Sequence, residues 1–255
     1  MGRFFLIISF FCVLRIEAQT FPNYIAHAGG AGGIMGQCIY SNSKEAIMQS
    51  IERGYTFIEV DLDTTSDGFL VASHDWASFH INGGHPEYGD SVFSLQSFKE
   101  TIICGEFTPI TIDELVDILQ DYPSVYIVTD KISDVDLLDR SLSGIRDRVY
   151  VEAFSIEDFI RLREVGYHPM YSRYVVGLAS IIVENLINGE ARIDFITNSV
   201  SDNFKEMARL KCLMPFKIAT YTSNSKEFVD EHLGEEIDLI YTDFYNPQTG
   251  QFESK

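Results

Sequence analysis

The chain has 255 residues, and its 19 Lys and Arg against 38 Asp and Glu give a formal net charge of −19. Apolar residues make up 45% and charged residues 22%. This globular composition excludes a disordered chain, a collagen-like repeat and a coiled coil. The acidic excess argues against nucleic acid or an anionic membrane surface as the partner, because both require a basic surface. It does not exclude a small phosphate-bearing substrate, since one bound cation reverses the field of a site.

The N-terminal residues have the pattern of a secretory signal. A basic residue precedes the apolar run Phe4–Leu14, and charged residues follow it. The run is shorter than the roughly 20 apolar residues that span a bilayer, so we predict no stable transmembrane span. We predict a signal peptide over residues 1–18, cleaved after Ala18, and export of a single domain over residues 19–255. An uncleaved anchor or an additional N-terminal strand or helix stays open.

The cysteine pattern indicates neither a disulfide framework nor zinc. Of the four cysteines, Cys12 lies in the predicted signal, which leaves Cys38, Cys104 and Cys212. This odd and widely spaced set contains no CxxC pair. One bridge, between Cys38 and Cys104, stays open in an oxidising compartment. We nevertheless expect buried or inert thiols.

Short strand-like runs alternate with helical patterns along the chain. The predicted strands are Tyr24–His27, Phe57–Leu62, Val125–Asp130, Val149–Phe154, Pro169–Ser172, Phe195–Asn198, Lys217–Thr222 and Leu239–Phe244. Helix N-cap residues predict helices from Asn42 to about Gly54, from Thr111 to Gln120, from Ser155 to Gly166 and from Ser225 to about Gly234. Further helices are expected near 179–188 and 202–213.

Eight strand–helix units in one domain predict a parallel sheet covered by helices. Their number favours a closed TIM-type (β/α)8 barrel, although an open doubly wound sheet has the same periodicity. No GxGxxG motif follows the first strand, which argues against nucleotide binding.

One connection is too short for the alternation. After the second strand only Thr64–Gly68 separates it from the next apolar run, and parallel strands need a crossover of a dozen or more residues. Asp67-Gly68 is a hairpin signal. We therefore predict that Phe69–His74 returns antiparallel and brings His74 beside the second strand.

The second strand carries two acidic side chains on one face. Because side chains alternate along a strand, Glu59 and Asp61 share the face opposite Ile58, Val60 and Leu62. The apolar face suits packing under helices, so the carboxylates are expected in the barrel lumen. Two close carboxylates repel each other unless a cation lies between them, and oxygen ligands favour Ca²⁺ or Mg²⁺. The alternative is an edge strand with both carboxylates in water.

Two histidines have a context that suggests acid–base chemistry. His27 ends the first strand, at the barrel end where such enzymes place their active sites, and glycines follow it. His74 is predicted to return beside the carboxylates. Imidazoles titrate near neutrality and suit a base and an acid around one bound group. The remaining histidines are expected to be structural or exposed: His80, His85, His168 and His232.

Further site candidates come from later strands. Asp130 ends the third parallel strand and Lys131 follows it, so a third carboxylate and a phosphate-binding cation stand side by side. Alternation prevents both from facing the lumen unless the strand ends or bulges at Asp130; a surface Asp–Lys pair is the alternative. Glu152 and Tyr221 are second-tier candidates for substrate binding.

The chain resembles the glycerophosphodiester phosphodiesterase family, among the phosphodiesterases similar to phosphatidylinositol-specific phospholipase C. The matching segments are IAHAGG (25–30), YSNSKEA (40–46), FIEVDLDTTSDGFLVASHDW (57–76), TPITIDELVDIL (108–119), VYIVTDK (125–131), IATYTSN (218–224) and LIYTDF (239–244). The resemblance implies a TIM-type barrel that hydrolyses a small-molecule phosphodiester with a divalent cation. The implied roles are catalysis for His27 and His74, metal ligation for Glu59, Asp61 and Asp130, and phosphate contact for Lys131.

Two departures from the family pattern bear on the substrate. Family members usually have one residue between the third ligand and the lysine, whereas Asp130 and Lys131 are adjacent. Many members carry an arginine after the first histidine, where this chain has Ala28. This suggests another head group, another phosphate contact or a weakened enzyme. Alternatives are a non-catalytic ligand-binding barrel, a metal-dependent barrel acting on a carbonyl, and a carbohydrate-active barrel using two carboxylates.

Overall fold

The structure, a computed structural model, describes residues 23–30, 38, 40–172, 193–202, 204–211 and 216–253. The predicted signal peptide and the helix expected near 179–188 lie outside these residues. No helix in the described ranges is both long and apolar enough to cross a bilayer.

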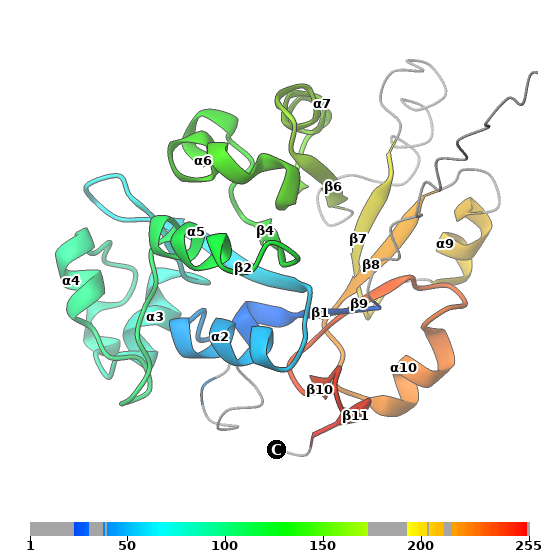
Figure 1. Cartoon of the computed structure of the whole chain (residues 1–255), viewed down its shortest axis with the longest axis horizontal. Coiled ribbons are helices and arrows are strands. Elements are labelled where there is room, and N and C mark those ends of the chain that lie inside the picture. The colour runs from blue at the N-terminus through cyan, green and yellow to red at the C-terminus, as the bar shows by residue number, and fades with distance from the viewer. Residues whose placement is uncertain are drawn as a thin grey trace, which may run out of the picture.

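Eight parallel strands of the described chain form the closed barrel that the alternation predicts (Figure 1). They are β1 (Tyr24–Ala26), β2 (Phe57–Thr64), β4 (Tyr126–Asp130), β5 (Val149–Ala153), β6 (His168–Ser172), β7 (Phe195–Ser199), β8 (Lys217–Tyr221) and β9 (Leu239–Thr242). Strand β1 pairs in parallel with both β9 and β2, which closes the ring. The observed strands begin and end within two residues of the predicted ones.

Helices surround the barrel, and three of the four predicted from N-cap residues begin at those residues, which are Thr111, Ser155 and Ser225. The helices are α2 (Lys44–Glu52), α5 (Ile112–Gln120), α6 (Val135–Leu142), α7 (Ile156–Val165), α9 (Phe204–Lys211) and α10 (Lys226–His232), with 3-10 turns η1 (His27–Gly30) and η3 (Ser143–Arg148). Thr111 and Glu114 form a reciprocal capping box at α5. A short antiparallel pair, β10 (Tyr245–Asn246) and β11 (Gln251–Phe252), follows the barrel.

The exception is helix α2, where the prediction of Asn42 as N-cap is wrong. The cap is Ser43, whose hydroxyl accepts a hydrogen bond from the Ala46 N–H at 3.2 Å. Asn42 has a left-handed backbone with φ of 46° and is fully buried. Its amide instead bonds the carboxylate of Asp61. A polar residue suited to capping is thus used inside the barrel mouth.

The short connection after β2 forms the predicted hairpin. Strand β3 (Leu70–Ala72) pairs antiparallel with the end of β2, with Leu62 opposite Ala72. Helix α3 (Trp76–Asn82), the 3-10 turn η2 (Pro86–Tyr88) and α4 (Leu95–Glu100) follow. Together α3 and α4 lie at one side of the barrel, outside the ring (Figure 1). They enclose a small core of their own around Trp76 and Phe98.

A disulfide joins this insertion to the segment before α2. Cys38 and Cys104 are bonded across a sequence separation of 66 residues. The expectation of free thiols is therefore wrong for these two cysteines; Cys12 and Cys212 lie outside the described residues. Both bonded cysteines belong to the insertion's small apolar cluster, so packing brings them together. Their spacing in the sequence does not reveal this contact.

The barrel strands separate two packed layers. On β2, Ile58, Val60 and Leu62 pack outward under the helices, as predicted. Phe57 on the opposite face belongs to an apolar cluster that fills the lower lumen. Glu59 and Asp61 follow it upward along the same face. An apolar cluster rich in aromatic side chains thus fills the lower lumen. Above it, polar side chains lie at the carboxyl ends of the strands, where barrel enzymes place their active sites.

Candidate active site

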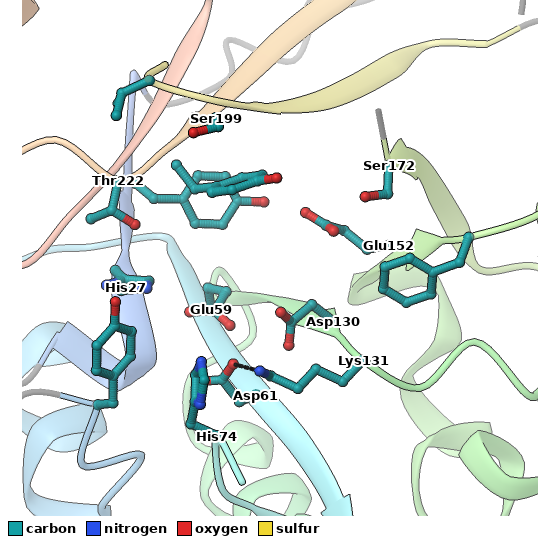
Figure 2. A pocket seen from close by; sticks show the side chains of 15 residues that line it. His27, Glu59, Asp61, His74, Asp130, Lys131, Glu152, Ser172, Ser199 and Thr222 are labelled. Carbon is teal, nitrogen blue, oxygen red and sulfur yellow. Dashed lines mark ion pairs between the residues drawn. The ribbon is translucent and has the colours of Figure 1, made fainter. Parts of the chain in front are cut away.

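A cavity of about 760 Å³ opens at the carboxyl end of the barrel. It gathers every site residue that the sequence predicts: His27, Glu59, Asp61, His74, Asp130, Lys131, Glu152 and Tyr221. Figure 2 shows the two histidines on one side of this cavity, the three acidic residues in the middle and Glu152 across from the histidines. Residues on or directly after β1, β2, β3, β4, β5 and β8 thus converge although they are far apart in the chain.

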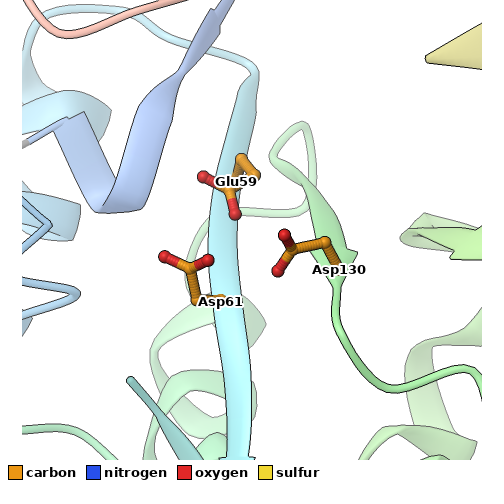
Figure 3. Close-up of side chains that lie close together, drawn as sticks. All are labelled: Glu59, Asp61 and Asp130. Carbon is orange, nitrogen blue, oxygen red and sulfur yellow. The ribbon is translucent and has the colours of Figure 1, made fainter. Parts of the chain in front are cut away.

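Three carboxylates meet at the floor of the cavity (Figure 3). One oxygen each of Glu59, Asp61 and Asp130 can be chosen so that all lie within 4.8 Å of one another. The parallel register explains this, because Asp61 on β2 lies directly opposite Asp130 on β4. Glu59 lies two residues earlier on the same lumen face of β2. The side chains are held by strands rather than by loops, which favours a fixed geometry.

Neighbouring donors fix two of these carboxylates. The Ala28 N–H donates to Glu59 Oε2 at 2.6 Å. The Asn42 amide donates to Asp61 Oδ2 at 2.8 Å, and its oxygen accepts from the Asp61 N–H at 3.0 Å. Ala28 has a left-handed backbone with φ of 49°. That turn aims its N–H at the carboxylate.

The electrostatics of the cluster suit a divalent cation. Burial and the adjacent Asp61 raise the pKa of Glu59 well above its usual value, and the same two causes raise that of Asp130. Asp130 Oδ1 is buried without a hydrogen-bond partner among the described residues. Lys131 Nζ, 3.5 Å from Asp61 Oδ1, gives only partial compensation. An all-oxygen set of three carboxylates therefore fits Ca²⁺ or Mg²⁺ better than zinc.

Both Asp130 and Lys131 reach the cavity because strand β4 ends at Asp130. Lys131 then adopts a left-handed backbone with φ of 65°. This turn removes the alternation that sends successive side chains to opposite faces. The surface-pair alternative is wrong, and the adjacency of the two residues does not prevent a joint role.

His27 is oriented by a carboxylate from the opposite end of the sequence. Its Nδ1 lies 2.9 Å from Asp243 Oδ1. Asn224 donates to the other Asp243 oxygen at 2.7 Å and accepts from the Asp243 N–H at 2.8 Å. The side chains of His27 and Asp243 are both mostly buried. The contact leaves Nε2 as the ring nitrogen available to a substrate.

His74 has a more open setting. Its Nδ1 lies 2.5 Å from Asp75 Oδ2, and about a third of its side chain is exposed. Asp75 also caps α3, accepting the Ser78 N–H at 2.7 Å. The hairpin positions the residue as predicted, since the neighbouring Ser73 N–H donates to the Asp61 carbonyl.

Tyr40 lies between the two imidazoles. Its ring centroid is 4.9 Å from that of His27, edge to face, and 4.9 Å from that of His74. Burial and the carboxylates of Asp243 and Asp61 raise the pKa of Tyr40, so its phenol stays protonated at neutral pH. Its backbone is left-handed, with φ of 59°.

The sequence predictions missed Tyr40, Asn42 and Asp243. Asp243 carried a usable signal, since an acidic residue directly follows a barrel strand. The other two lie in the irregular connection after β1, where no periodicity points to a contact.

The histidines expected to be structural or exposed lie outside the cavity. His80 is buried in the insertion and contacts the Ser91 carbonyl at 2.7 Å. His168 contacts the Asp147 carbonyl and stacks on Tyr150. The other two, His85 and His232, face Glu87 and Glu236.

The barrel and its two imidazoles above three carboxylates define a class, that of barrel hydrolases acting on phosphodiesters. The model of the glycerophosphoryl diester phosphodiesterase family matches residues 27–166, which is more than half of the chain. The chain therefore belongs to this family and is a phosphoric diester hydrolase. A comparison with curated proteins gave no match.

Solved structures of low sequence identity share the fold. A phosphodiesterase from Oleispira antarctica, in complex with the product sn-glycerol-3-phosphate, has a TM-score of 0.66 at 15% identity, over 89% of this chain and 94% of that one. Glycerophosphodiester phosphodiesterases from Thermotoga maritima (19% identity, 87% and 94%) and Parabacteroides distasonis (18% identity, 87% and 92%) each have a TM-score of 0.64.

Proposed function

We propose that this protein hydrolyses a glycerophosphodiester or a related lipid head-group diester in a reaction that depends on a divalent cation. The observation that carries the proposal is the convergence of two imidazoles and three carboxylates on one cavity. Support for the substrate class comes from the family and from the Oleispira antarctica structure, which contains sn-glycerol-3-phosphate.

The proposed cation site consists of Glu59, Asp61 and Asp130. A divalent ion bound there supplies positive charge for a non-bridging phosphate oxygen. Asn42 and the Ala28 N–H hold two of the ligands in place. Lys131, beside Asp61, supplies a further cation to the phosphate. Ca²⁺ and Mg²⁺ both match this donor chemistry.

The two imidazoles carry the proton transfers. One takes the proton from the attacking hydroxyl, which comes from water or from the substrate itself, and the other protonates the leaving alkoxide. Asp243 fixes the ring of His27 and Asp75 that of His74. Glu152 and Tyr221 line the same cavity, and we assign them to substrate contacts away from the reacting atoms.

The test is a screen of purified protein against glycerophosphodiesters, lysophospholipids and a chromogenic phosphodiester, with and without EDTA. We expect release of an alcohol from at least one diester, lost in EDTA and restored by Ca²⁺ or Mg²⁺. Turnover that survives thorough chelation would contradict cation dependence. Binding of the ion without turnover of any diester would favour a non-catalytic barrel instead.

We also propose that the protein is exported and that residues 1–18 are removed. The basic start and short apolar run support a signal peptide, and the Cys38–Cys104 disulfide suits an oxidising compartment. N-terminal sequencing and thiol counting of the protein from its natural host test this. An intact Met1 together with reduced Cys38 and Cys104 would refute it.

A further inference from the structure

The Cys38–Cys104 disulfide joins two segments that both contribute a side chain to the cavity. Cys38 lies in the connection between β1 and α2, two residues before Tyr40, which lines the cavity. Cys104 lies between α4 and α5, at the end of the insertion, and His74 on the cavity lining comes directly before the first helix of that insertion. The bond therefore links the segment that carries Tyr40 to the segment that carries His74.

The insertion side of the bond is held firmly by packing. The Cys104 N–H donates to the Asn82 carbonyl, at the end of α3, at 2.7 Å. Ile103 is 1% exposed and belongs to the apolar core of the insertion together with Trp76, the first residue of α3. Because Trp76 follows His74 by two residues, Cys104 and His74 are attached to the same packed unit.

The position of Tyr40, in contrast, gains little from burial. Its side chain is 40% exposed, and its φ of 59° is one that residues other than glycine rarely adopt. Such a backbone persists only where its surroundings hold it. Two residues of chain place the Tyr40 Cα within about 7 Å of the Cys38 Cα. The disulfide is therefore close enough to fix where the ring meets His27 and His74.

Asn42, two residues further along the same connection, is held in a different way. It is fully buried, and its N–H donates to the Ala28 carbonyl at 3.2 Å. Its side chain makes two hydrogen bonds with Asp61. These contacts do not need the disulfide. Loss of the bond should therefore affect Tyr40 and the imidazoles, and leave the carboxylate cluster in place.

We propose that the Cys38–Cys104 disulfide is a positioning element for catalysis, which keeps the Tyr40 ring between His27 and His74. The protein then reaches full activity only when this bond is formed. The inference rests on the proposed function, because it concerns the two histidines to which that function assigns the proton transfers. A bond that served stability alone would leave both imidazoles of the folded protein where they are.

The first test is a double-mutant cycle on kcat/KM for a chromogenic phosphodiester, measured well below the unfolding temperature of every variant. Cys38→Ala with Cys104→Ala should lower kcat/KM by about 2- to 10-fold, the loss expected of Tyr40→Leu. Adding Tyr40→Leu to that pair should cost little more, because both changes remove the same contact. Phe98→Leu is the matched control, since it weakens the apolar core of the insertion but keeps the bond. It should leave kcat/KM unchanged.

The second test does not depend on turnover and follows the imidazole C–H resonances by NMR. Those of His27 and His74 should shift in the double cysteine variant, whereas that of His168, on β6, should not. Wild-type protein treated with a dithiol provides the same comparison with both side chains kept. The dithiol reduces the bond to two thiols and is itself oxidised to a cyclic disulfide. Calorimetry should show Ca²⁺ affinity unchanged, because Asn42 still holds Asp61.

Two results would overturn the proposal. One is a cycle in which the loss from the cysteine pair and the loss from Tyr40→Leu multiply, which would mean that the bond does not act through the ring. The other is a folded protein without the bond whose His27 and His74 resonances stay in place. If the wild type hydrolyses no phosphodiester, the proposed function fails instead, and the NMR comparison still decides whether the bond positions the imidazoles.

Discussion

The two halves of the barrel contribute different chemistry to the same cavity. Strands β1, β2 and β4, with the hairpin after β2, carry both histidines, the three clustered carboxylates and Lys131. Strands β5 to β9 contribute hydroxyl and aromatic side chains, and Glu152 is the exception among them. The charged half suits the reacting phosphate, whereas the more neutral half suits the part of the substrate that does not react.

This division has one structural consequence. The charged half matches the family model, which spans residues 27–166, whereas most of the neutral half lies beyond that match. Asp243 breaks the division, since it follows β9 and yet orients His27 across the closing pair β1–β9. We therefore expect catalysis to require the closed ring and not the first half alone.

The largest effect is expected from removing the carboxylates of the charged half. Glu59→Gln combined with Asp61→Asn should abolish binding of Ca²⁺ and Mg²⁺ in calorimetry and lower kcat by about 10³-fold or more, since a bound ion contributes several kcal/mol to the transition state. Asp63→Asn, two residues further along β2 and outside the cluster, is the control. Full activity in the double variant would contradict the division into halves.

The same carboxylates predict how the stability of the metal-free protein depends on pH. Because burial raises the pKa of Glu59 and Asp130, the folded protein keeps protons that the unfolded chain releases above about pH 4. Stability is therefore greatest below that pH, as far as these two groups are concerned, and falls as the pH rises through the raised values. Denaturant titrations in EDTA should show this loss, and added Ca²⁺ or Mg²⁺ should remove it. A flat profile in EDTA would contradict the proposed repulsion.

The histidines come next in expected effect. His27→Ala and His74→Ala should each lower kcat by about 10²- to 10⁴-fold, because each removes one proton-transfer group. Circular dichroism and thermal unfolding should show an intact fold. His80→Ala is an unsuitable control, since that ring is buried in the insertion, whereas His85→Ala changes an exposed ring and should be silent. Wild-type turnover in either catalytic variant would refute the assignment.

Asp243 tests whether the second half takes part in catalysis. Asp243→Asn should misplace His27 and lower kcat by about 10- to 100-fold, since small displacements of a catalytic group cost that much. Asp75→Asn affects the more exposed pair at His74, so a smaller loss is expected there. If the two losses in kcat are equal, the greater burial of the His27–Asp243 pair does not increase its contribution to catalysis. Pre-steady-state rates would separate the chemical step from product release.

The sequence predicted the scaffold and the charged half well because both depend on local regularities. Alternation along β2 assigns Glu59 and Asp61 to the lumen, and a gap too short for a crossover requires the hairpin that returns His74. These rules act over a few residues and need no tertiary information. The barrel boundaries were predicted for the same reason.

The remaining errors share a cause, which is contact between distant or irregular segments. Asn42 has ordinary capping chemistry, and only the tertiary approach of Asp61 changes its role. Cys38 and Cys104 meet because the insertion forms its own apolar core. Tyr40 lies where no period applies, in a backbone conformation that non-glycine residues rarely adopt. None of these contacts follows from spacing along the chain.

Substitution of Tyr40 should have the smallest effect on activity. It tests whether an aromatic ring helps to hold the two histidines of the charged half. Its ring is the same distance from both imidazoles, so Tyr40→Leu should loosen both and lower kcat/KM by about 2- to 10-fold, the range of a lost aromatic contact. Tyr40→Phe keeps the ring and should stay near wild type. The pH–rate profile should shift in Tyr40→Leu only, because a loosened imidazole changes its environment. If Phe and Leu lower activity equally, the hydroxyl acts on the substrate and the ring does not hold the histidines. Tyr40 would then contact the substrate through its hydroxyl, as we expect of the polar side chains of the second half.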